Sequence, residues 1–483
     1  MDRAGTAGTG TQRLVTETLG DLLDRAAACG QRHIVEAAEG LDDQGRSRLA
    51  ESLARVPWDD WDQLHALVVD PPGAAPPSAM RPPVACTMAQ IDGDALKARG
   101  EEALHRGAVA VFTVAGGQGT RLGWNGPKGT FPATAITGKS LFQVQAERIK
   151  AAVSHYGQPV RWYIMTSAEN HEDTRRFLLD NRCFGIDRTH VQLVQQGMMP
   201  AFDATSGDLL MAAPDRLALS PDGHGGAFAA LDRSGAIEHM RHRGIEHISW
   251  VQIDNPLVRV LDPTFIGLHL CDVTSSGEFS SKIVGRAHAA ERVGVFVEAD
   301  AGMQVVEYSD FDESQAAAVG DDGELVWRAA NIAVHLLSVE FMADAAAAGT
   351  GALPWHRAHK AVGYYCPAQG DMIMPDAPNA IKLERFVFDA LSRAQTPALL
   401  EVQRAEEFAP IKNASGDDSA HSSSALQMAL HRDWLRQASV QVDDAAQVEI
   451  SPLVAQWAED LAGTPLPDQV SADAPFVLEH DSA

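Results

Sequence analysis

With 483 residues, the chain is too long for one ordinary hydrophobic core, so its length predicts two or three domains. Apolar residues make up 45% and charged residues 22%, a balance typical of a soluble globular protein. The formal net charge of −26 argues against a nucleic-acid-binding surface and against binding to an anionic membrane. A local basic pocket in such a chain can still bind a small anion.

Features that mark secretion are missing from the sequence. The N-terminus, MDRAGTAGTGTQ, lacks the apolar segment of a signal peptide, and no apolar run is long enough to span a bilayer. The five cysteines are far apart and show no CxxC spacing, which is typical of reduced thiols and not of a disulfide or zinc framework. We therefore expect a cytoplasmic protein.

The first hundred residues are expected to be mainly helical. Leucines recur near helical spacing from Leu14 to Leu23, RSRLAESLARV continues the pattern, and PWDDWDQLHAL begins another helix behind a proline. The proline-rich segment 71–85 is typical of a linker. These patterns predict a helical N-terminal region at 1–100 that ends in a proline-rich connection.

From about residue 107 onward, predicted strands alternate with predicted helices. The strands are VAVFTV, RWYIMTS, VQLVQQ and GIEHISWVQID, and the helices between the first three are SLFQVQAERIKAAVSHY and HEDTRRFLLDN. Continuous apolar strands separated by helices pack into a mainly parallel sheet that is covered on both faces, so we predict an α/β domain at 101–400. Beyond it, the helix HSSSALQMALHRDWLRQA and the short, exposed strands of VQVDDAAQVEI predict a small C-terminal domain at 401–483.

The segment directly after the first strand, AGGQGTRLGWNGPKG at 115–129, is a glycine-rich loop that keeps two cations. Glycine lets a backbone approach a bulky group closely and adopt positive φ. Ligands of open parallel sheets collect beyond the carboxyl ends of the strands, which is where this loop begins. The cations, Arg121 and Lys128, indicate an anion with more than one charge.

Three kinds of phosphate-binding loop, and a plain strand-to-helix turn, compete as interpretations of this segment. A Walker A loop needs GxxxxGK[ST], but Ala133 takes the place of the glycine upstream of GKS at 138–140. A dinucleotide loop needs GxGxxG, but Leu122 takes the third glycine position, and that loop needs no cations. The remaining interpretation is GGxGTRLG followed by PKG, a loop for a nucleoside triphosphate.

AGGQGTRLG, PKG and KSLFQVQAERI resemble the eukaryotic-type UDP-N-acetylglucosamine pyrophosphorylases and their UDP-sugar pyrophosphorylase relatives. Further ordered blocks extend the resemblance almost from end to end: QQGMMPAFD, SPDGHGGAFAAL, VQIDNPLVRVLDPTFIG, VGVFVE, QVVEYSDF, AANIAVH, IKLERFVFDAL and EEFAPIKNA. The resemblance implies a nucleotide-diphospho-sugar transferase fold, a Rossmann-like domain with a mixed, mostly parallel sheet. A helical N-terminal segment and a small C-terminal α+β domain would flank it.

The resemblance also implies a uridylyltransferase, which joins UTP and a sugar 1-phosphate to give a UDP-sugar and pyrophosphate. The attacking phosphate oxygen is already an anion, so catalysis is mostly positioning and electrostatic stabilisation, with Mg²⁺ or Mn²⁺ as cofactor. In this view Arg121 and Lys128 hold the β- and γ-phosphates. Lys412 reaches the sugar or α-phosphate from the C-terminal side, which makes closure of a mobile lid plausible. The alternative for each cation is a solvated surface residue.

Asp254 and the nucleotide-binding positions follow the same resemblance. Asp254 ends the strand ISWVQI, where a carboxylate among phosphates is a natural magnesium ligand; the alternative is a cap of the turn Asp-Asn-Pro. Gln196 would recognise uracil, because an amide donates and accepts at once, although it could also be a buried, satisfied glutamine. The predicted nucleotide-binding residues are Ala115, Gly116, Gly117, Gly119, Gln196 and Gly223.

The sugar would meet a carboxylate and an amide for its hydroxyls and aromatic edges for an acetyl methyl. The matching positions are His224, Glu307, Asn331, Lys382, Phe386 and Phe388. Both phenylalanines could instead belong to the core, and Lys382 could be a surface residue.

The sugar itself stays open at this point, because His224 stands where the N-acetylglucosamine enzymes have asparagine in PDGNGG. A histidine occurs in the related GHGD block of glucose and broad-specificity enzymes, but Gly226 replaces its aspartate. NIA, VVEY, FVF and IKNA favour N-acetylglucosamine 1-phosphate. The alternatives are glucose 1-phosphate or a broad sugar range, or a catalytically silent nucleotide-binding protein on the same fold. We expect a monomer or weak homodimer without nucleic-acid or membrane partners.

Overall fold

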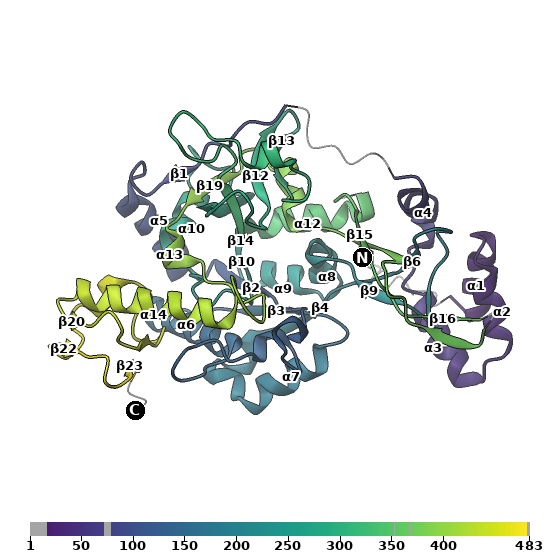
Figure 1. The fold of residues 1–483 in the computed structure, drawn as a ribbon, viewed down its shortest axis with the longest axis horizontal. Coiled ribbons are helices and arrows are strands. Elements are labelled where there is room, and N and C mark those ends of the chain that lie inside the picture. Colours follow the sequence, from purple (N-terminus) through teal and green to yellow (C-terminus); the bar gives the residue numbers. More distant parts are fainter. Residues whose placement is uncertain (1–16, 72–78, 352, 368, 481–483) are drawn as a thin grey trace, which may run out of the picture. The chain divides into compact units, whose positions relative to one another are not determined.

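The computed structural model describes residues 17–71, 79–351, 353–367 and 369–480 (Figure 1). Most of the predicted proline-rich connection, and the start of the leucine pattern at Leu14, lie outside these ranges. The chain divides into two compact units. The N-terminal unit holds the chain up to Pro72 with Met198–Ser220 and His356–Glu384, and the central unit holds Gly73–Gly197, Pro221–Trp355 and Arg385–Ala483.

This division differs from the ranges expected from the sequence. Two segments from within the predicted range 101–400 belong to the N-terminal unit, and 401–483 belongs to the central unit. Pairing between distant segments is the reason: β18 (Ala380–Glu384) lies between β15 (His356–Lys360) and β6 (Phe202–Asp203) in a small sheet. The three predicted ranges remain a prediction of how the chain is organised into domains.

Helices dominate the start of the N-terminal unit, as predicted. In α1 (Leu19–Ala28), Thr18 accepts a hydrogen bond from the N–H of Asp21 and the Asp21 carboxylate bonds back to Thr18, which is a capping box. Each helix buries one apolar stripe, represented by Leu22, Ile34, Leu49 and Leu64. The other helices are α2 (Arg32–Glu39), α3 (Asp43–Leu53) and α4 (Trp61–Val69).

The central unit is built on a mixed, mostly parallel sheet in the order β1-β19-β11-β14-β10-β2-β3-β4, with the hairpin β12–β13 attached at β14 (Figure 1). Only β14 runs antiparallel to its neighbours β10 and β11 along this path. The predicted fold class is therefore confirmed. The bounds are β1 Cys86–Thr87, β2 Val109–Val114, β3 Trp162–Thr166, β4 Val191–Gln195, β10 His247–Gln252, β11 Phe279–Gly285, β12 Val295–Ala299, β13 Gly302–Val306, β14 Ala329–Ser338 and β19 Ala398–Glu401.

Strand β2 shows why the apolar run VAVFTV is continuous. Val109 and Val111 pack into one hydrophobic core, whereas Ala110 and Phe112 pack into the core on the other face. Alternate side chains of a strand point to opposite faces, so a strand covered on both sides must be apolar at every position. The covering helices are α5 (Gly93–His105), α6 (Leu141–Tyr156) and α10 (Pro263–His269) on one face, and α8 (Ala227–Arg233), α9 (Ala236–His242) and α12 (Val339–Ala347) on the other.

The chain order of the strands reverses at β2. From β2 the chain continues through β3 to β4 on one side, while β10 lies on the other side. Loops that leave the carboxyl ends of two such strands diverge and leave a crevice between them, the usual ligand site of an open α/β sheet. The glycine loop follows β2, and Asp254 follows β10.

The C-terminal part of the central unit has its own apolar core around Trp434, Leu435 and Ile450. The predicted helix is confirmed as α14 (Ala420–Gln437), but the prediction of exposed strands is wrong for β21 (Val448–Ile450), which is fully buried. It pairs with β23 (Phe476–Leu478) and packs under α14, contacts that its local sequence does not reveal. No helix in the described ranges is long and apolar enough to cross a membrane.

Candidate functional site

The glycine loop leaves β2 with its carbonyl groups held by a buried amide. Asn170, which is fully buried, donates from Nδ2 to the carbonyl oxygens of Ala115 (2.9 Å) and Gly117 (3.2 Å). Within the described residues, the N–H groups of Gly116, Gly117 and Gln118 donate to no protein acceptor. Free backbone donors at the carboxyl end of a strand form an anion-binding cradle.

Close contacts explain two of the glycines in this loop. A Cβ added at Gly116 would lie 2.4 Å from Oε1 of Gln196, and one at Gly119 would lie 2.7 Å from Cβ of Trp124. Gly117 differs, because a Cβ there would meet nothing within 4 Å. The loop is therefore packed tightly against Gln196 and Trp124 but faces open space at Gly117.

The two cations of the loop lie in different surroundings. Arg121 is in an exposed 3₁₀ turn, Thr120–Leu122, and forms no ion pair or hydrogen bond through its side chain with any described residue. Lys128 is mostly buried, and its Nζ lies 3.1 Å from Oδ2 of Asp254. The structure therefore brings the loop after β2 and the acid after β10 together, as the predicted site requires.

Asp254 is a buried carboxylate between two lysines. Burial pushes its pKa up, but the charges of Lys128 and Lys412 outweigh burial and hold the pKa below its ordinary value. Asp254 is therefore ionised at neutral pH and can interact with a cation.

The residue before Lys412 is hydrogen-bonded to the backbone of Asp254, and the N–H of Lys412 itself donates to the Asp418 carbonyl (2.6 Å). The N–H of Ile411 donates to the carbonyl oxygen of Asp254 (2.9 Å), and the half-buried Lys412 places its Nζ 5.5 Å from the ring centre of Phe408. The sequence suggested that a mobile lid would have to bring Lys412 to the phosphates. Here the segment that carries it is already bonded to the Asp254 loop.

Gln196 and Gly223 are connected through Asp222 and Arg385. Gln196 directly follows β4, is 7% exposed and touches Gly116. Gly197 follows Gln196, and its carbonyl accepts a hydrogen bond from the N–H of Asp222 (3.1 Å). The Asp222 carbonyl in turn accepts from the N–H of Arg385 (2.9 Å). Gly223 has φ +81°, and a Cβ there would lie 2.3 Å from the Arg385 carbonyl oxygen, so this position requires glycine.

The predicted sugar-binding residues of the central unit form two groups. The ring of His224 lies 5.3 Å from that of Phe386 and 5.6 Å from that of Phe388, and its Nδ1 accepts a hydrogen bond from the N–H of Val387. This bond requires the tautomer that carries its proton on Nε2. Phe388 is buried, whereas Phe386 is half-buried.

The second group is Glu307 and Asn331, which both adjoin Gly294. The N–H of Asn331 donates to the Gly294 carbonyl (2.9 Å), and a Cβ at Gly294 would lie 3.2 Å from Oε1 of Glu307. Strand β13, which ends just before Glu307, packs against the 3₁₀ helix Val387–Arg393, so the two groups are neighbours. Lys382 lies on β18 in the N-terminal unit, and its sugar-binding role remains a prediction.

Sequence reasoning missed several residues that shape this site. Asn170 directly precedes the helix HEDTRRFLLDN, where a helix cap is expected, but its side chain makes no cap hydrogen bond and bonds to the glycine loop instead. By its sequence context Asn255 indicates only a turn, although its side chain bonds to two residues shortly before Lys412, Glu407 and Ala409. The Asp222–Arg385 contact joins residues 163 positions apart, and no local pattern predicts it.

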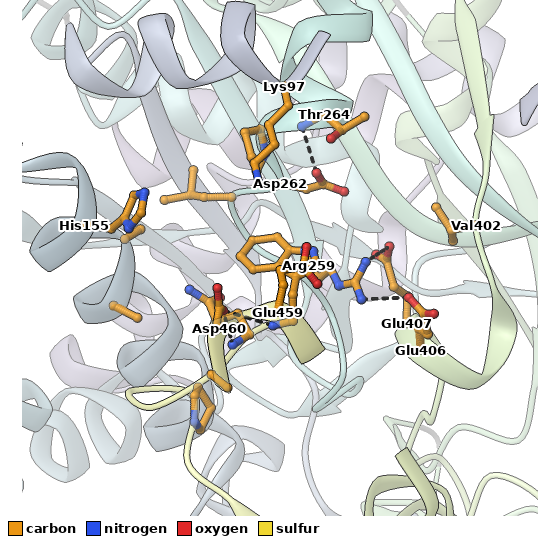
Figure 2. A pocket seen from close by; sticks show the side chains of 18 of the residues that line it. Lys97, His155, Arg259, Asp262, Thr264, Val402, Glu406, Glu407, Glu459 and Asp460 are labelled. Carbon is orange, nitrogen blue, oxygen red and sulfur yellow. Dashed lines mark hydrogen bonds and ion pairs between the residues drawn. The ribbon is translucent and has the colours of Figure 1, made fainter. Parts of the chain in front are cut away.

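A separate cavity of about 1030 Å³ also lies in the central unit (Figure 2). None of the residues predicted for the site lines it. Figure 2 shows the guanidinium of Arg259 directed at Glu406 and Glu407, which it contacts at 2.8 and 3.4 Å. Acidic residues outnumber lysine and arginine in its lining, so the cavity is a negative environment. Burial, and then the charges of Glu101, Asp262 and Asp460, raise the pKa of Tyr156 in its wall.

Known proteins resemble this chain over most of its length. UDP-N-acetylglucosamine diphosphorylase 1 of Arabidopsis thaliana is 33% identical over 466 residues, which are 91% of this chain and 90% of that protein. The UDP-N-acetylglucosamine pyrophosphorylase of Saccharomyces cerevisiae is 35% identical over 370 residues, which are 75% of this chain and 77% of that protein.

Solved structures agree with the sequence comparison. The uridine diphosphate N-acetylglucosamine pyrophosphorylase of Trypanosoma brucei matches with a TM-score of 0.80 at 27% identity, over 97% of this chain and 99% of that one. A model of the UTP–glucose-1-phosphate uridylyltransferase family matches residues 78–457. The predicted resemblance and fold are thus confirmed, and the chain belongs to the UTP–glucose-1-phosphate uridylyltransferase family.

Proposed function

We propose that this enzyme joins UTP and N-acetylglucosamine 1-phosphate to give UDP-N-acetylglucosamine and pyrophosphate. The observation that carries the proposal is the contact of Lys128 with Asp254, 3.1 Å apart at the carboxyl ends of neighbouring strands. The segment that carries Lys412 is hydrogen-bonded to the same Asp254. Free N–H groups of the glycine loop after β2 complete a site for a polyphosphate.

In this reaction an oxygen of the sugar 1-phosphate attacks the α-phosphorus of UTP. The new oxygen–phosphorus bond forms as the bond to the β-phosphate oxygen breaks, and pyrophosphate leaves with that electron pair. No proton has to be transferred, since the attacking oxygen is already anionic. The chain must therefore hold the reactants in line and stabilise the charge that grows on the leaving group.

Each residue of the site has a task in this proposal. The backbone of Ala115–Gly119 binds the phosphates, Gln196 recognises uracil, and Gly223 admits the nucleoside. Arg121 and Lys128 hold the pyrophosphate portion, and Lys412 neutralises the α-phosphate or the sugar phosphate. One such oriented donor typically lowers the barrier by about 2.7–4 kcal/mol. His224, Glu307, Asn331, Lys382, Phe386 and Phe388 are the proposed sugar-binding residues.

The donor set fits a divalent cation shared with the substrate. Among the described residues no three His, Cys, Asp or Glu side chains are grouped to hold a metal, so a closed protein cage is not available. Mg²⁺ commonly binds one or two protein carboxylates and completes its coordination shell with phosphate oxygens and water. Asp254, which is ionised and interacts with Lys128 and Lys412, can supply one such carboxylate. When bound, Mg²⁺ or Mn²⁺ would neutralise phosphate charge.

The sugar assignment is supported by the names of the two relatives described above, and it is opposed by one residue. His224 packs against both Phe386 and Phe388, and its Nδ1 already accepts a hydrogen bond from Val387. A histidine at this place is the reason to keep glucose 1-phosphate, or a broad sugar range, as the second candidate. We further propose a cytoplasmic monomer or weak homodimer.

The test is pyrophosphate release from UTP and Mg²⁺ with a panel of sugar 1-phosphates. We expect release only when a sugar 1-phosphate is present, and most with N-acetylglucosamine 1-phosphate. Release with glucose 1-phosphate alone would overturn the sugar assignment and keep the reaction. UTP binding without release from any member of the panel would leave a catalytically silent nucleotide-binding protein.

A further inference from the structure

The segment that carries Lys412 has little regular structure to hold it in place. Between α13 (Arg404–Glu407) and α14, the chain from Phe408 to Lys412 belongs to no helix or strand. The position of Lys412 therefore depends on hydrogen bonds to its surroundings. The bonds to the Asp254 loop come from two consecutive residues, Asp254 and Asn255.

The Asn255 side chain makes most of these bonds. Its Nδ2 donates to the carbonyl oxygen of Glu407 (2.6 Å), and its Oδ1 accepts from the N–H of Ala409 (3.1 Å). The Ile411 N–H, one step further along, bonds to the carbonyl of Asp254 (2.9 Å). Asn255 is only 4% exposed, so water does not readily replace these bonds.

Only a side-chain amide satisfies both partners at this position. A carboxylate would accept from Ala409 but would turn an acceptor toward the Glu407 carbonyl, and an apolar side chain would leave both backbone groups unpaired. Asn255 also accepts from the N–H of Leu257 (3.2 Å), which fixes the turn after Asp254. One residue thus fixes both the carboxylate loop and the lysine segment.

A buried ion network fixes the other end of this arrangement. Glu407 accepts from Nζ of Lys282 at 2.6 Å, and the same Nζ donates to Asp262 at 2.6 Å. Arg259 contacts Glu407 and Glu406, as Figure 2 shows. The ion pairs hold the Glu407 side chain in place, and the bond from Asn255 holds its carbonyl. Together they fix the position of the backbone at Phe408, where the segment that leads to Lys412 begins.

We infer that Asn255 is a positioning residue that holds Lys412 beside Asp254, so that the lysine is in place before substrate arrives. The kinetic part of this inference rests on the proposed function. The residue acts only through Lys412 and the Asp254 turn, and among the described residues its side chain forms no hydrogen bond with the glycine loop or with Gln196.

The kinetic test is a double-mutant cycle in the full chain with Asn255→Ala, Lys412→Ala and the pair. We expect each single variant to lower kcat by about 10²-fold while KM for UTP stays within about threefold. The pair should be no slower than Lys412→Ala alone, since Asn255 acts through that lysine. A pair that loses the product of the two single effects would overturn the inference.

Hydrogen exchange separates this inference from the proposed function, because it needs no turnover. In the wild-type chain the amides of Ala409 and Ile411 should be protected, and Asn255→Ala should speed their exchange by about tenfold or more. Lys412→Ala should leave their exchange unchanged. Asn181→Ala, which removes an exposed amide bonded to the Phe177 carbonyl, is the matched control.

Each exchange result decides the question even if no sugar 1-phosphate is used. Unprotected Ala409 and Ile411 amides in the wild-type chain would overturn the inference, and this measurement does not depend on a variant folding. Unchanged protection in Asn255→Ala would overturn it as well. Asn255→Asp, which keeps the acceptor and loses the donor, should also lower kcat, and full activity in this variant would contradict the need for an amide.

Discussion

Replacing Lys128 with alanine tests the contact on which the proposed function depends. The Nζ of Lys128 and Oδ2 of Asp254 are 3.1 Å apart, and their side chains are only 16% and 12% exposed. At an effective dielectric constant of about 20, attraction across that distance is about 5 kcal/mol before desolvation is subtracted. The variant loses this attraction, and it also loses the cation that the proposed function assigns to the phosphates.

Two effects are expected in Lys128→Ala. Loss of one oriented cationic donor should lower kcat by about 10²- to 10³-fold. In addition, the pKa of Asp254 should rise, since Lys128 is the largest influence that opposes burial. Asp254 in the wild type has a lowered pKa, so its stabilising ionised form is lost only as pH falls through that lowered value. In the variant this loss should begin at higher pH.

The assay is initial rates of pyrophosphate release at saturating UTP and sugar 1-phosphate from about pH 3 to 9, a range that extends below the ordinary carboxyl pKa of 3.8. Lys97→Ala, which removes an exposed lysine of the separate cavity, is the control and should keep wild-type kcat. A kcat for Lys128→Ala within about threefold of wild type would refute the role of Lys128. An acid limb that did not move to higher pH would refute the electrostatic coupling to Asp254.

Four further variants probe other parts of the structure. Arg121→Ala should lower kcat by about 10²-fold and leave UDP-sugar binding, measured by calorimetry, nearly unchanged; equal losses in both would remove its role on the leaving group. Gly116→Ala should weaken UTP binding, because the new Cβ would lie 2.4 Å from Gln196. Gly117→Ala should keep the wild-type melting temperature and raise KM for UTP. A Gly116→Ala chain with wild-type KM would contradict the first expectation. Lys282→Met should lower the free energy of unfolding in urea by about 3–5 kcal/mol, since it removes the buried cation that Asp262 and Glu407 both contact at 2.6 Å; a loss below about 1 kcal/mol would contradict it.

The sequence predicts local elements of the central unit well. An uninterrupted apolar run implies burial on both faces, and Val109 to Phe112 do alternate between two cores. The glycine loop could be placed because it directly follows such a strand, and Asp254 because it ends another. The approach of Lys128 to Asp254 then follows from strand order, since β2 and β10 are parallel neighbours.

Contacts between distant segments could not be predicted in this way. Phe202 pairs with Ile381 in the small sheet of the N-terminal unit, but the alternation of a strand gives no information about its partner. The same limit applies to β21, whose apolar side chains pack under α14, and to Asn170 and Asn255. Asparagine is a common turn residue, so its presence in the sequence indicates only a turn. Asn170 and Asn255 act by hydrogen-bonding to backbone groups of distant segments, which come within reach only in the folded chain.

The pair of Lys128 and Asp254 explains how a buried carboxylate is stable before the substrate binds. An isolated charge in this place would be costly, and two lysines compensate for it. A triphosphate attracts the same lysines, so its arrival weakens their hold on Asp254 and exposes the carboxylate to a second cation. Nucleotide and divalent cation should therefore bind together and not separately. Because Ile411 is bonded to Asp254, Lys412 is already near the carboxylate when the partners change.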